Sequence, residues 1–264
     1  MELKQAKEKA LEFGVKALLT RNNYKTDKSV KFGYLAAILH LAPYKISGRN
    51  VCSMAELASC IQGCLNTSGH GGMASTFTEV SGVSVPDNIV QTARINRTKF
   101  YHAERGAFMM LLAHEISVFI KYAEKLDLTP CIRLNGTSDI RWEVGHYVEY
   151  KGNLYHSIFD TFQSVQFYDY TKIPNRKHIP NNYHLTWSYS GASEKYAAMR
   201  PAEFSWAVVF NTAKNEDLPD SFLGRPVIDA DQHDLRFLDS SQCVAGLRAK
   251  GRAKQDTSGF VVHV

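Results

Sequence analysis

The chain has 264 residues, of which 44% are hydrophobic and 22% charged, and its formal net charge is +5. This composition is typical of a folded globular protein and excludes a collagen-like or wholly disordered chain. No stretch of 18 uncharged apolar residues is present, and the charged N-terminal segment lacks the apolar block of a signal peptide. We therefore expect a cytoplasmic protein without a membrane segment.

The N-terminal part of the chain alternates between apolar and polar segments. Leucine and alanine residues recur at helical spacing over residues 2–20, which predicts an amphipathic helix. A polar stretch at 21–31 precedes an apolar segment at 32–41, and a strand is expected near 39–44. The pattern predicts an N-terminal helical extension, residues 1–38, followed by one domain over 39–264.

The clearest helix is expected from about residue 103 to 126. Its apolar residues recur at intervals of three and four, and Pro130 follows as a stop signal. They are Phe108, Leu111, Leu112, Ile116, Phe119, Ile120 and Ala123.

Short runs of apolar and aromatic residues follow this helix, as is typical of buried parallel strands. The runs lie at 131–134, 165–170, 183–189, 206–210, 227–229 and 244–247. Most spacings leave room for crossover helices, so we predict a single α/β domain that forms a partial or full (β/α) barrel. A flat doubly wound sheet is the alternative, although no glycine-rich dinucleotide or phosphate loop follows any of these runs.

Polar side chains follow several of the predicted strands, where α/β folds place their active sites. The candidates are Asn135, Ser138, Asp139, Asp169, Lys172 and Ser188. Asp139 could act as an acid or base or hold a ribose hydroxyl, or it could only cap a helix. Asp169 and Lys172 could be catalytic or could form a structural ion pair.

Three of the five cysteines fall within thirteen residues. Cys52, Cys60 and Cys64 have the spacing C-x7-C-x3-C. Three thiolates can hold a metal centre with one open coordination position, which favours catalysis, and His70 as a fourth ligand would favour zinc. The alternative is three buried thiols that pack as small apolar side chains. The other two cysteines lie in apolar runs and are expected in the core.

Two further charged clusters have open interpretations. Asp229, Asp231, His233 and Asp234 could bind a divalent cation or could form an ordinary polar loop. Four basic residues close to the C-terminus could contact phosphates of a nucleic acid or could simply be solvated. These are Arg248, Lys250, Arg252 and Lys254.

Several segments resemble the gene-product-88-like family of phage- and plasmid-borne proteins. The resemblance covers residues 40–264. It is carried by residues 50–72, RINRT at 94–98, RLNGTSDIRWE at 133–143, VQFYDYTK at 165–172, NYHLT at 182–186, PVID at 226–229 and GLRAKG at 246–251.

A weaker resemblance is to radical-SAM-like phage proteins. These carry a cysteine triad, then a strand that ends in a Ser-Asp turn and another that ends in Thr-Lys. Here Ser138-Asp139 and Thr171-Lys172 stand in that order. The resemblance implies an α/β barrel, a [4Fe-4S] cluster on the three cysteines and S-adenosylmethionine, although the usual cysteine spacing is C-x3-C-x2-C.

The first functional hypothesis is therefore a radical-SAM-like iron–sulfur enzyme of phage or plasmid origin that acts on nucleic acid or a nucleotide in the host cytoplasm. Asp139, Asp169 and Lys172 are its expected catalytic residues. Asn135, Ser138 and Ser188 are expected to bind the cofactor, and an electron donor is the expected partner.

Two alternatives belong to other functional classes. The first is a transglycosylase-type barrel with structural zinc, in which Asp139 or Asp169 attacks a sugar carbon. The second is a nucleic-acid-binding or host-interaction protein without catalysis.

Overall fold

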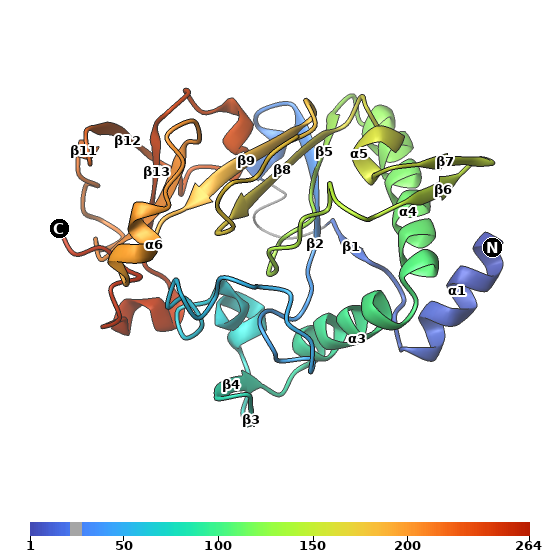
Figure 1. Cartoon of the computed structure of the whole chain (residues 1–264), viewed down its shortest axis with the longest axis horizontal. Coiled ribbons are helices and arrows are strands. Elements are labelled where there is room, and N and C mark those ends of the chain that lie inside the picture. The colour runs from blue at the N-terminus through green and yellow to red at the C-terminus, as the bar shows by residue number, and fades with distance from the viewer. Residues whose placement is uncertain (22–27) are drawn as a thin grey trace.

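The computed structural model describes residues 1–21 and 28–264, which form a mixed α/β domain built on one large sheet (Figure 1). The strand order is β1-β2-β5-β8-β9-β10-β13-β12-β11. The seven central strands are parallel to their neighbours, whereas β1 and β11 pair antiparallel at the two edges. The α/β prediction is confirmed. A barrel is not formed over the described residues, because each edge is occupied by an antiparallel strand and the sheet stays open.

The strands of the large sheet are short. They are β1 (Leu19–Thr20), β2 (Tyr34–Leu39), β5 (Thr129–Arg133), β8 (Gln166–Thr171), β9 (Tyr183–Ser188), β10 (Trp206–Phe210), β11 (Ser221–Phe222), β12 (Arg225–Asp229) and β13 (Val244–Arg248). Two separate hairpins are β3 (Phe77–Val80) with β4 (Val83–Pro86), and β6 (Val148–Tyr150) with β7 (Asn153–Tyr155).

The first parallel strand lies earlier in the chain than expected. The strand predicted at 39–44 is β2, which ends at Leu39. The chain then turns toward α3, where the backbone N–H of Ala42 donates to the hydroxyl of Thr98 at 2.8 Å. Pro43 has no N–H to offer a neighbouring strand. The loop after β2 is therefore longer than the sequence indicated, and it holds all three clustered cysteines.

Five α-helices of different lengths and several 3-10 turns complete the described part of the fold. The helices are α1 (Leu3–Glu12), α3 (Ile89–Ala103), α4 (Arg105–Lys125), α5 (Ile158–Thr161) and α6 (Glu194–Ala198), and the 3-10 turns are η1 (Leu65–Thr67), η2 (Gly69–Gly72), η3 (Arg236–Leu238) and η4 (Gly251–Gln255). The predicted helix at 103–126 is α4. Crossover helices were expected between most strands, but α5 and α6 are a single turn or little more, and β8 connects to β9 without a helix.

The helix predicted over residues 2–20 ends early, at Glu12. Gly14 has a φ of +69°, and the N–H groups of Gly14 and Val15 donate to the carbonyls of Leu11 and Ala10, both at 2.8 Å. This is the pattern of a Schellman cap, in which glycine accepts the left-handed conformation without a steric penalty.

The N-terminal residues belong to the main core. Ala6 and Ala10 of α1 are buried in the same cluster as α4 and the strands. The expected boundary after residue 38 falls inside β2, and residues 22–27 of the predicted polar stretch lie outside the described residues. The division into an extension and a domain stays a prediction.

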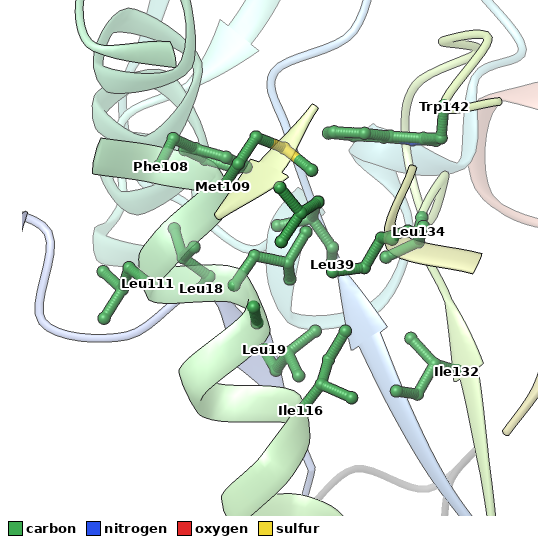
Figure 2. Close-up of a cluster of buried hydrophobic side chains, with 14 of the residues drawn as sticks. Leu18, Leu19, Leu39, Phe108, Met109, Leu111, Ile116, Ile132, Leu134 and Trp142 are labelled. Carbon is green, nitrogen blue, oxygen red and sulfur yellow. The ribbon is translucent and has the colours of Figure 1, made fainter. Parts of the chain in front are cut away.

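The main core lies between α4 and one face of the sheet (Figure 2). Phe108, Ile116 and Phe119 of α4 pack with Ile132 of β5 and Phe167 of β8, and all five are at most 1% exposed. By length and composition α4 could also cross a membrane, but 56% of its apolar stretch is buried inside the protein. That burial is what a core helix shows.

The opposite face of the sheet is covered by the segment that follows β12. Leu235 and Phe237 pack there against Tyr168 of β8 and Cys131 of β5. Arg133 of β5 donates to Asp234 at 2.7 Å on this face. Both faces of the sheet are therefore covered. The part that remains for a site is the edge formed by the carboxyl ends of the parallel strands, as distinct from the outer strands β1 and β11.

Candidate functional site

The carboxyl ends of β2, β5, β8 and β9 meet along one edge of the sheet. Four loops meet there, at residues 40–76, 134–147, 172–182 and 189–193. In Figure 1 the loop after β2 lies below the arrowheads of β8 and β9, beside α3 and the C-terminal turns. Eight of the nine predicted site residues lie in these loops or at the end of β9, and the ninth, Asp169, lies within β8.

Backbone contacts hold the cysteine loop against the loop after β5. The N–H of Asp139 donates to the carbonyl of Val51 at 2.8 Å, and the Cys52 thiol lies 4.0 Å from the carbonyl of Thr137. Cys60 packs against three apolar clusters, and Cys64 precedes η1. The fold therefore brings the residues around the cysteines to the end of β5.

All three thiols of the cysteine loop are buried enough to ionise less readily than a free cysteine. Burial raises the pKa of Cys52 well above its usual value, raises that of Cys60 and raises that of Cys64 to about 11. Cys60 and Cys64 each add to the pKa increase at Cys52. Within residues 1–21 and 28–264, no group of three or more His, Cys, Asp or Glu side chains is arranged to hold a single metal ion. His70, the proposed fourth ligand, is exposed.

A site for one metal ion and a site for an iron–sulfur cluster differ in how the thiols must be spaced. Ligands of one ion all converge on the same atom, whereas ligands of a cluster bind different irons and stand farther apart.

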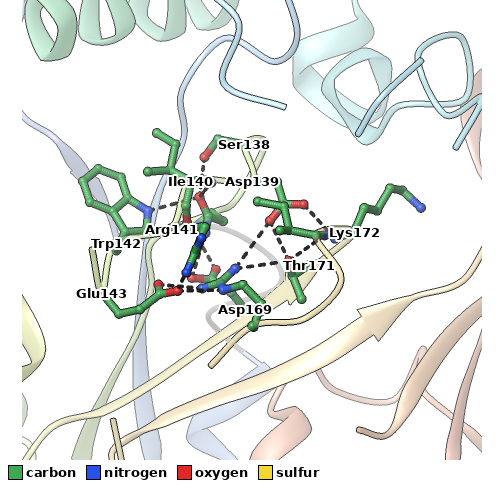
Figure 3. A network of polar contacts seen from close by, with 12 residues as sticks. Ser138, Asp139, Ile140, Arg141, Trp142, Glu143, Asp169, Thr171 and Lys172 are labelled. Carbon is green, nitrogen blue, oxygen red and sulfur yellow. Dashed lines mark hydrogen bonds and ion pairs between the residues drawn. The ribbon is translucent and has the colours of Figure 1, made fainter. Parts of the chain in front are cut away.

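Asp139 is fixed by the end of β8 (Figure 3). Its carboxylate accepts hydrogen bonds from the Thr171 hydroxyl at 2.9 Å and from the Lys172 N–H at 2.7 Å. Arg176 lies 3.9 Å away. Burial nevertheless raises the pKa of Asp139 above its usual value. The geometry gives Asp139 a clear role in holding the loop after β5 against β8.

The side chain of Lys172 extends away from this network (Figure 3). Its ammonium donates to the carbonyl of Ser188 at 3.0 Å and faces the rings of Tyr196 and Phe260 at 5.6 and 4.9 Å. Burial lowers the pKa of Lys172, and Cys60 is the strongest influence in the opposite direction. No described carboxylate lies within ion-pair distance of this ammonium.

Asp169 and Asn135 form a closed structural unit behind the site. The Asp169 carboxylate accepts from the Asn135 N–H at 2.7 Å and from the Tyr183 hydroxyl at 2.9 Å. The Asn135 side-chain oxygen accepts from Ser138 at 2.8 Å and from the Trp142 indole at 3.1 Å. Burial raises the pKa of Asp169 to about 7. Asn135, Ser138 and Asp169 therefore shape the loop after β5 by contacts within the chain.

Ser188 enters the site through its backbone. Its carbonyl accepts from the Lys172 ammonium and, at 2.8 Å, from the Tyr196 hydroxyl. The carbonyl thus fixes the position of the Lys172 ammonium. The expected contact between the Ser188 side chain and a cofactor stays a prediction.

Two site residues were not anticipated from the sequence. Arg176 forms a buried two-point ion pair with Glu143, with N–O distances of 2.8 and 2.7 Å, and this pair joins the loops after β5 and β8. Arg94 of α3 is 8% exposed and reaches the turn that follows Cys64. Gln91, Arg94 and Thr98 lie on one face of the helix, and the sequence carries no local signal that this polar face is buried.

The two other charged clusters are largely paired with each other. Arg248 donates to Asp229 at 3.0 Å, and Lys250 forms an ion pair with Asp231. Asp234 is not part of that group, because its carboxylate accepts a hydrogen bond from Arg133. Two of the four basic residues near the C-terminus are therefore neutralised, which weakens the interpretation of this segment as a phosphate-binding patch.

Comparison with known proteins identifies the family. A family model described as gene product 88 matches residues 15–264. The chain belongs to the gene product 88 family. No curated protein and no solved structure matches the chain. The family match agrees with the gene-product-88-like segments of the sequence, whereas it gives the radical-SAM resemblance no support.

Proposed function

We propose that this member of the gene product 88 family is an iron–sulfur enzyme whose cluster is held by Cys52, Cys60 and Cys64. The observation that carries the proposal is that one loop brings three cysteines to the edge where the parallel strands end, and that this loop contacts the loop after β5, whose Asp139 binds the backbone of Lys172. Active sites of open α/β sheets lie at this edge. The loop after the first parallel strand delivers all three thiols to it.

The donor set fits a cluster with one free iron. Three cysteines could bind three irons of a [4Fe-4S] cluster and leave the fourth iron open. Such a cluster would supply an open iron for S-adenosylmethionine and the electron for its reductive cleavage. The cofactor itself is proposed from the sequence resemblance alone.

The chain's own residues would act around that centre. Lys172 would hold an anionic group of the cofactor or substrate with its ammonium, which the Ser188 carbonyl positions. Asp139 would fix the backbone of Lys172, and Asn135 would fix the loop that contacts Cys52. We propose nucleic acid or a nucleotide as the substrate and an electron-donating protein as the partner, in a phage or plasmid setting.

The glycosyl-transfer alternative is less well supported. Asp169, one of its two candidate nucleophiles, has a fully buried carboxylate that already accepts from Asn135 and Tyr183. Asp139 is held in a similar way by Thr171 and Lys172. A nucleophile needs a free oxygen directed at the reacting carbon.

The deciding experiment is the iron and acid-labile sulfide content of anaerobically purified protein, together with its ultraviolet–visible spectrum. We expect about four irons and four sulfides per chain, as in a [4Fe-4S] cluster. Cys52→Ala, Cys60→Ala and Cys64→Ala should each lose most of the iron. Cys243→Ala, at a buried position before β13, is the matched control and should retain it. A colourless wild-type protein without iron after anaerobic reconstitution would refute the proposal, and bound zinc would favour a zinc-site alternative.

A further inference from the structure

A pocket of about 280 Å³ lies between the turns that follow the cysteines and the C-terminal turn η4. Its third wall is the β3–β4 hairpin, which Figure 1 shows next to the cyan turns of the cysteine loop. Two glycines line it, and the side chains on its lining are Thr67, Phe77, Pro86, Arg252 and Gln255. Pockets for small ligands have volumes from about 300 Å³ upward, so this one has room for a single planar group with its substituents.

Short contacts fix this pocket to the cysteine loop. The hydroxyl of Thr67 donates to the carbonyl of Cys64 at 3.0 Å. Gly251 has a φ of +56°, and a Cβ added there would stand 3.0 Å from the Ser68 hydroxyl oxygen. The turns η1 and η4 can approach closely because this residue has no side chain. A ligand in the pocket would therefore lie beside the loop that carries the cysteines.

Arg252 is the charged residue of the lining. Its Nη1 donates to the carbonyl of Ser84 at 3.2 Å, which anchors the guanidinium on β4. Within residues 1–21 and 28–264 its other two nitrogens have no hydrogen-bond partner, and neither is a buried atom, so both are open to solvent. The neighbouring Arg248 and Lys250 are instead neutralised by aspartates. An anchored guanidinium with free donors is suited to bind a phosphate.

Phe77 adds an aromatic surface to the same pocket. Its side chain is 48% exposed, and the Arg252 guanidinium lies 5.7 Å from the centre of its ring. Accessible aromatic rings beside positive charge are the surfaces on which single-stranded nucleic acids stack their bases. This separation is within the span of one nucleotide, whose base and phosphate could reach the two side chains together.

The polar character of the lining favours a nucleotide over an acidic peptide. The hydroxyl of Thr67 and the amide of Gln255 can bind the edges of a base, and Pro86 adds one small apolar surface. A peptide side chain that anchors an interface instead needs a largely apolar, enclosed pocket.

We propose that this pocket binds one nucleotide of a single-stranded nucleic acid, with the phosphate on Arg252 and the base against Phe77. A single strand is required because the bases of a duplex are already stacked and paired. The inference deepens the substrate part of the proposed function and rests on it for the role of nucleic acid, although the binding itself needs no iron.

The experiment is fluorescence anisotropy of labelled oligothymidylate and oligouridylate with the full chain over a range of salt concentrations. Arg252→Gln should weaken binding several-fold and reduce the salt slope by about 0.7, the value for one phosphate contact on a single strand. Arg252→Lys keeps the charge and should retain most of the binding. Phe77→Leu should weaken binding about tenfold, whereas Phe77→Tyr keeps the ring and should bind like the wild type.

Lys125→Gln is the matched control for charge. Lys125 is exposed at the end of α4, which precedes β5 and so lies at the opposite edge of the sheet. Its removal should leave binding unchanged. Equal weakening in Lys125→Gln and Arg252→Gln, or full binding in Phe77→Leu, would overturn the inference. Displacement of the probe by polyglutamate as readily as by unlabelled oligonucleotide would also overturn it and would assign the pocket to acidic peptides.

Iron content measured on the same samples separates this inference from the proposed function. If the wild type holds iron but binds neither oligomer, only the inference is overturned. If the wild type binds an oligomer through Arg252 and Phe77 but holds no iron, the pocket is supported and the iron–sulfur enzyme is refuted. The tighter of the two oligomers identifies the sugar that the pocket prefers.

Discussion

Asp169 shows how one buried side chain can serve the site without facing it. Its carboxylate is inaccessible to solvent, and it accepts hydrogen bonds from Asn135 and Tyr183. Asn135 in turn binds Ser138 and Trp142 and so shapes the loop that contacts Cys52. The arrangement makes Asp169 a pH-sensitive support of the loop after β5.

The pH dependence of stability follows from this burial, which raises the pKa of Asp169 to about 7. A carboxyl with a higher pKa in the folded than in the unfolded state takes up a proton on folding, so its contribution is fully present below about pH 4 and is lost as pH rises through 7. Relative to Asp169→Asn, the wild type should lose about 2 kcal/mol of unfolding free energy between pH 5 and pH 8. Urea unfolding at the two pH values measures this loss.

The control for this prediction is Asp127→Asn, which changes an exposed carboxyl. It should show the same pH dependence as the wild type. If Asp169→Asn also matches the wild type at both pH values, the raised pKa of Asp169 is wrong.

At the scale of elements, α3 connects the core to the cysteine loop. Asn88 caps the helix by accepting from the Gln91 N–H at 3.0 Å. The same side chain donates to the carbonyls of Gly71 and Met73 at 3.2 and 3.1 Å. One residue therefore joins the start of α3 to the turn η2.

Asn88→Ala should consequently have two effects. Loss of the cap should cost about 1 kcal/mol of unfolding free energy. Loss of the contacts to η2 should accelerate amide hydrogen exchange over residues 65–73, measured by mass spectrometry. Ser157→Ala is the matched control, because Ser157 caps α5 in the same way. It should lower stability without affecting that segment, and unchanged exchange in Asn88→Ala would contradict the double role.

The individual strands and helices differ in how well the sequence predicts them. Strand β10 has the expected bounds because Trp206–Phe210 is an unbroken apolar run. Helix α3 was not expected, because much of its buried stripe is polar rather than apolar. The hairpins β3–β4 and β6–β7 were not expected either, since their strands are only three or four residues long.

The candidate site was predictable where strand ends and cysteines marked it. Asp139 and Lys172 do lie together with the cysteine loop. The sequence could not distinguish side chains that face the site from those that support it. The carboxylate of Asp169 accepts hydrogen bonds from Asn135 and Tyr183, which are distant in the sequence, and only the fold shows this. A single arginine such as Arg94 gives no local signal of burial, so it too was missed.

At the scale of the whole molecule, the C-terminal segment closes over the cysteine loop. Val262 pairs with Phe210 beside the end of β10. Phe260 belongs to a cluster that includes Cys60, and its ring lies 3.0 Å from where a Cβ of Gly63 would stand. The ring also faces the Lys172 ammonium. The segment therefore shields one side of the candidate site.

Phe260→Ala should open that side. We expect a several-fold faster reaction of Cys60 with a thiol reagent in the metal-free protein, followed by peptide mass spectrometry. Phe237→Ala is the control, because Phe237 packs on Tyr34 and Tyr168 on the face of the sheet that is opposite to the main core, in a cluster without Cys60. Equal labelling rates in the two variants would show that the ring does not limit access.

The strand order has a consequence for how the chain can acquire its structure. From β2 to β10 each new parallel strand joins the one before it, so this part of the sheet can extend as the chain emerges during synthesis. Strand β13 breaks the sequence by entering between β10 and β12. Until Val244–Arg248 arrives, β10 and β12 each have a bare edge of unpaired N–H and carbonyl groups, which is a template for association with other chains. The last strand is therefore also the one that removes this hazard from the nascent protein.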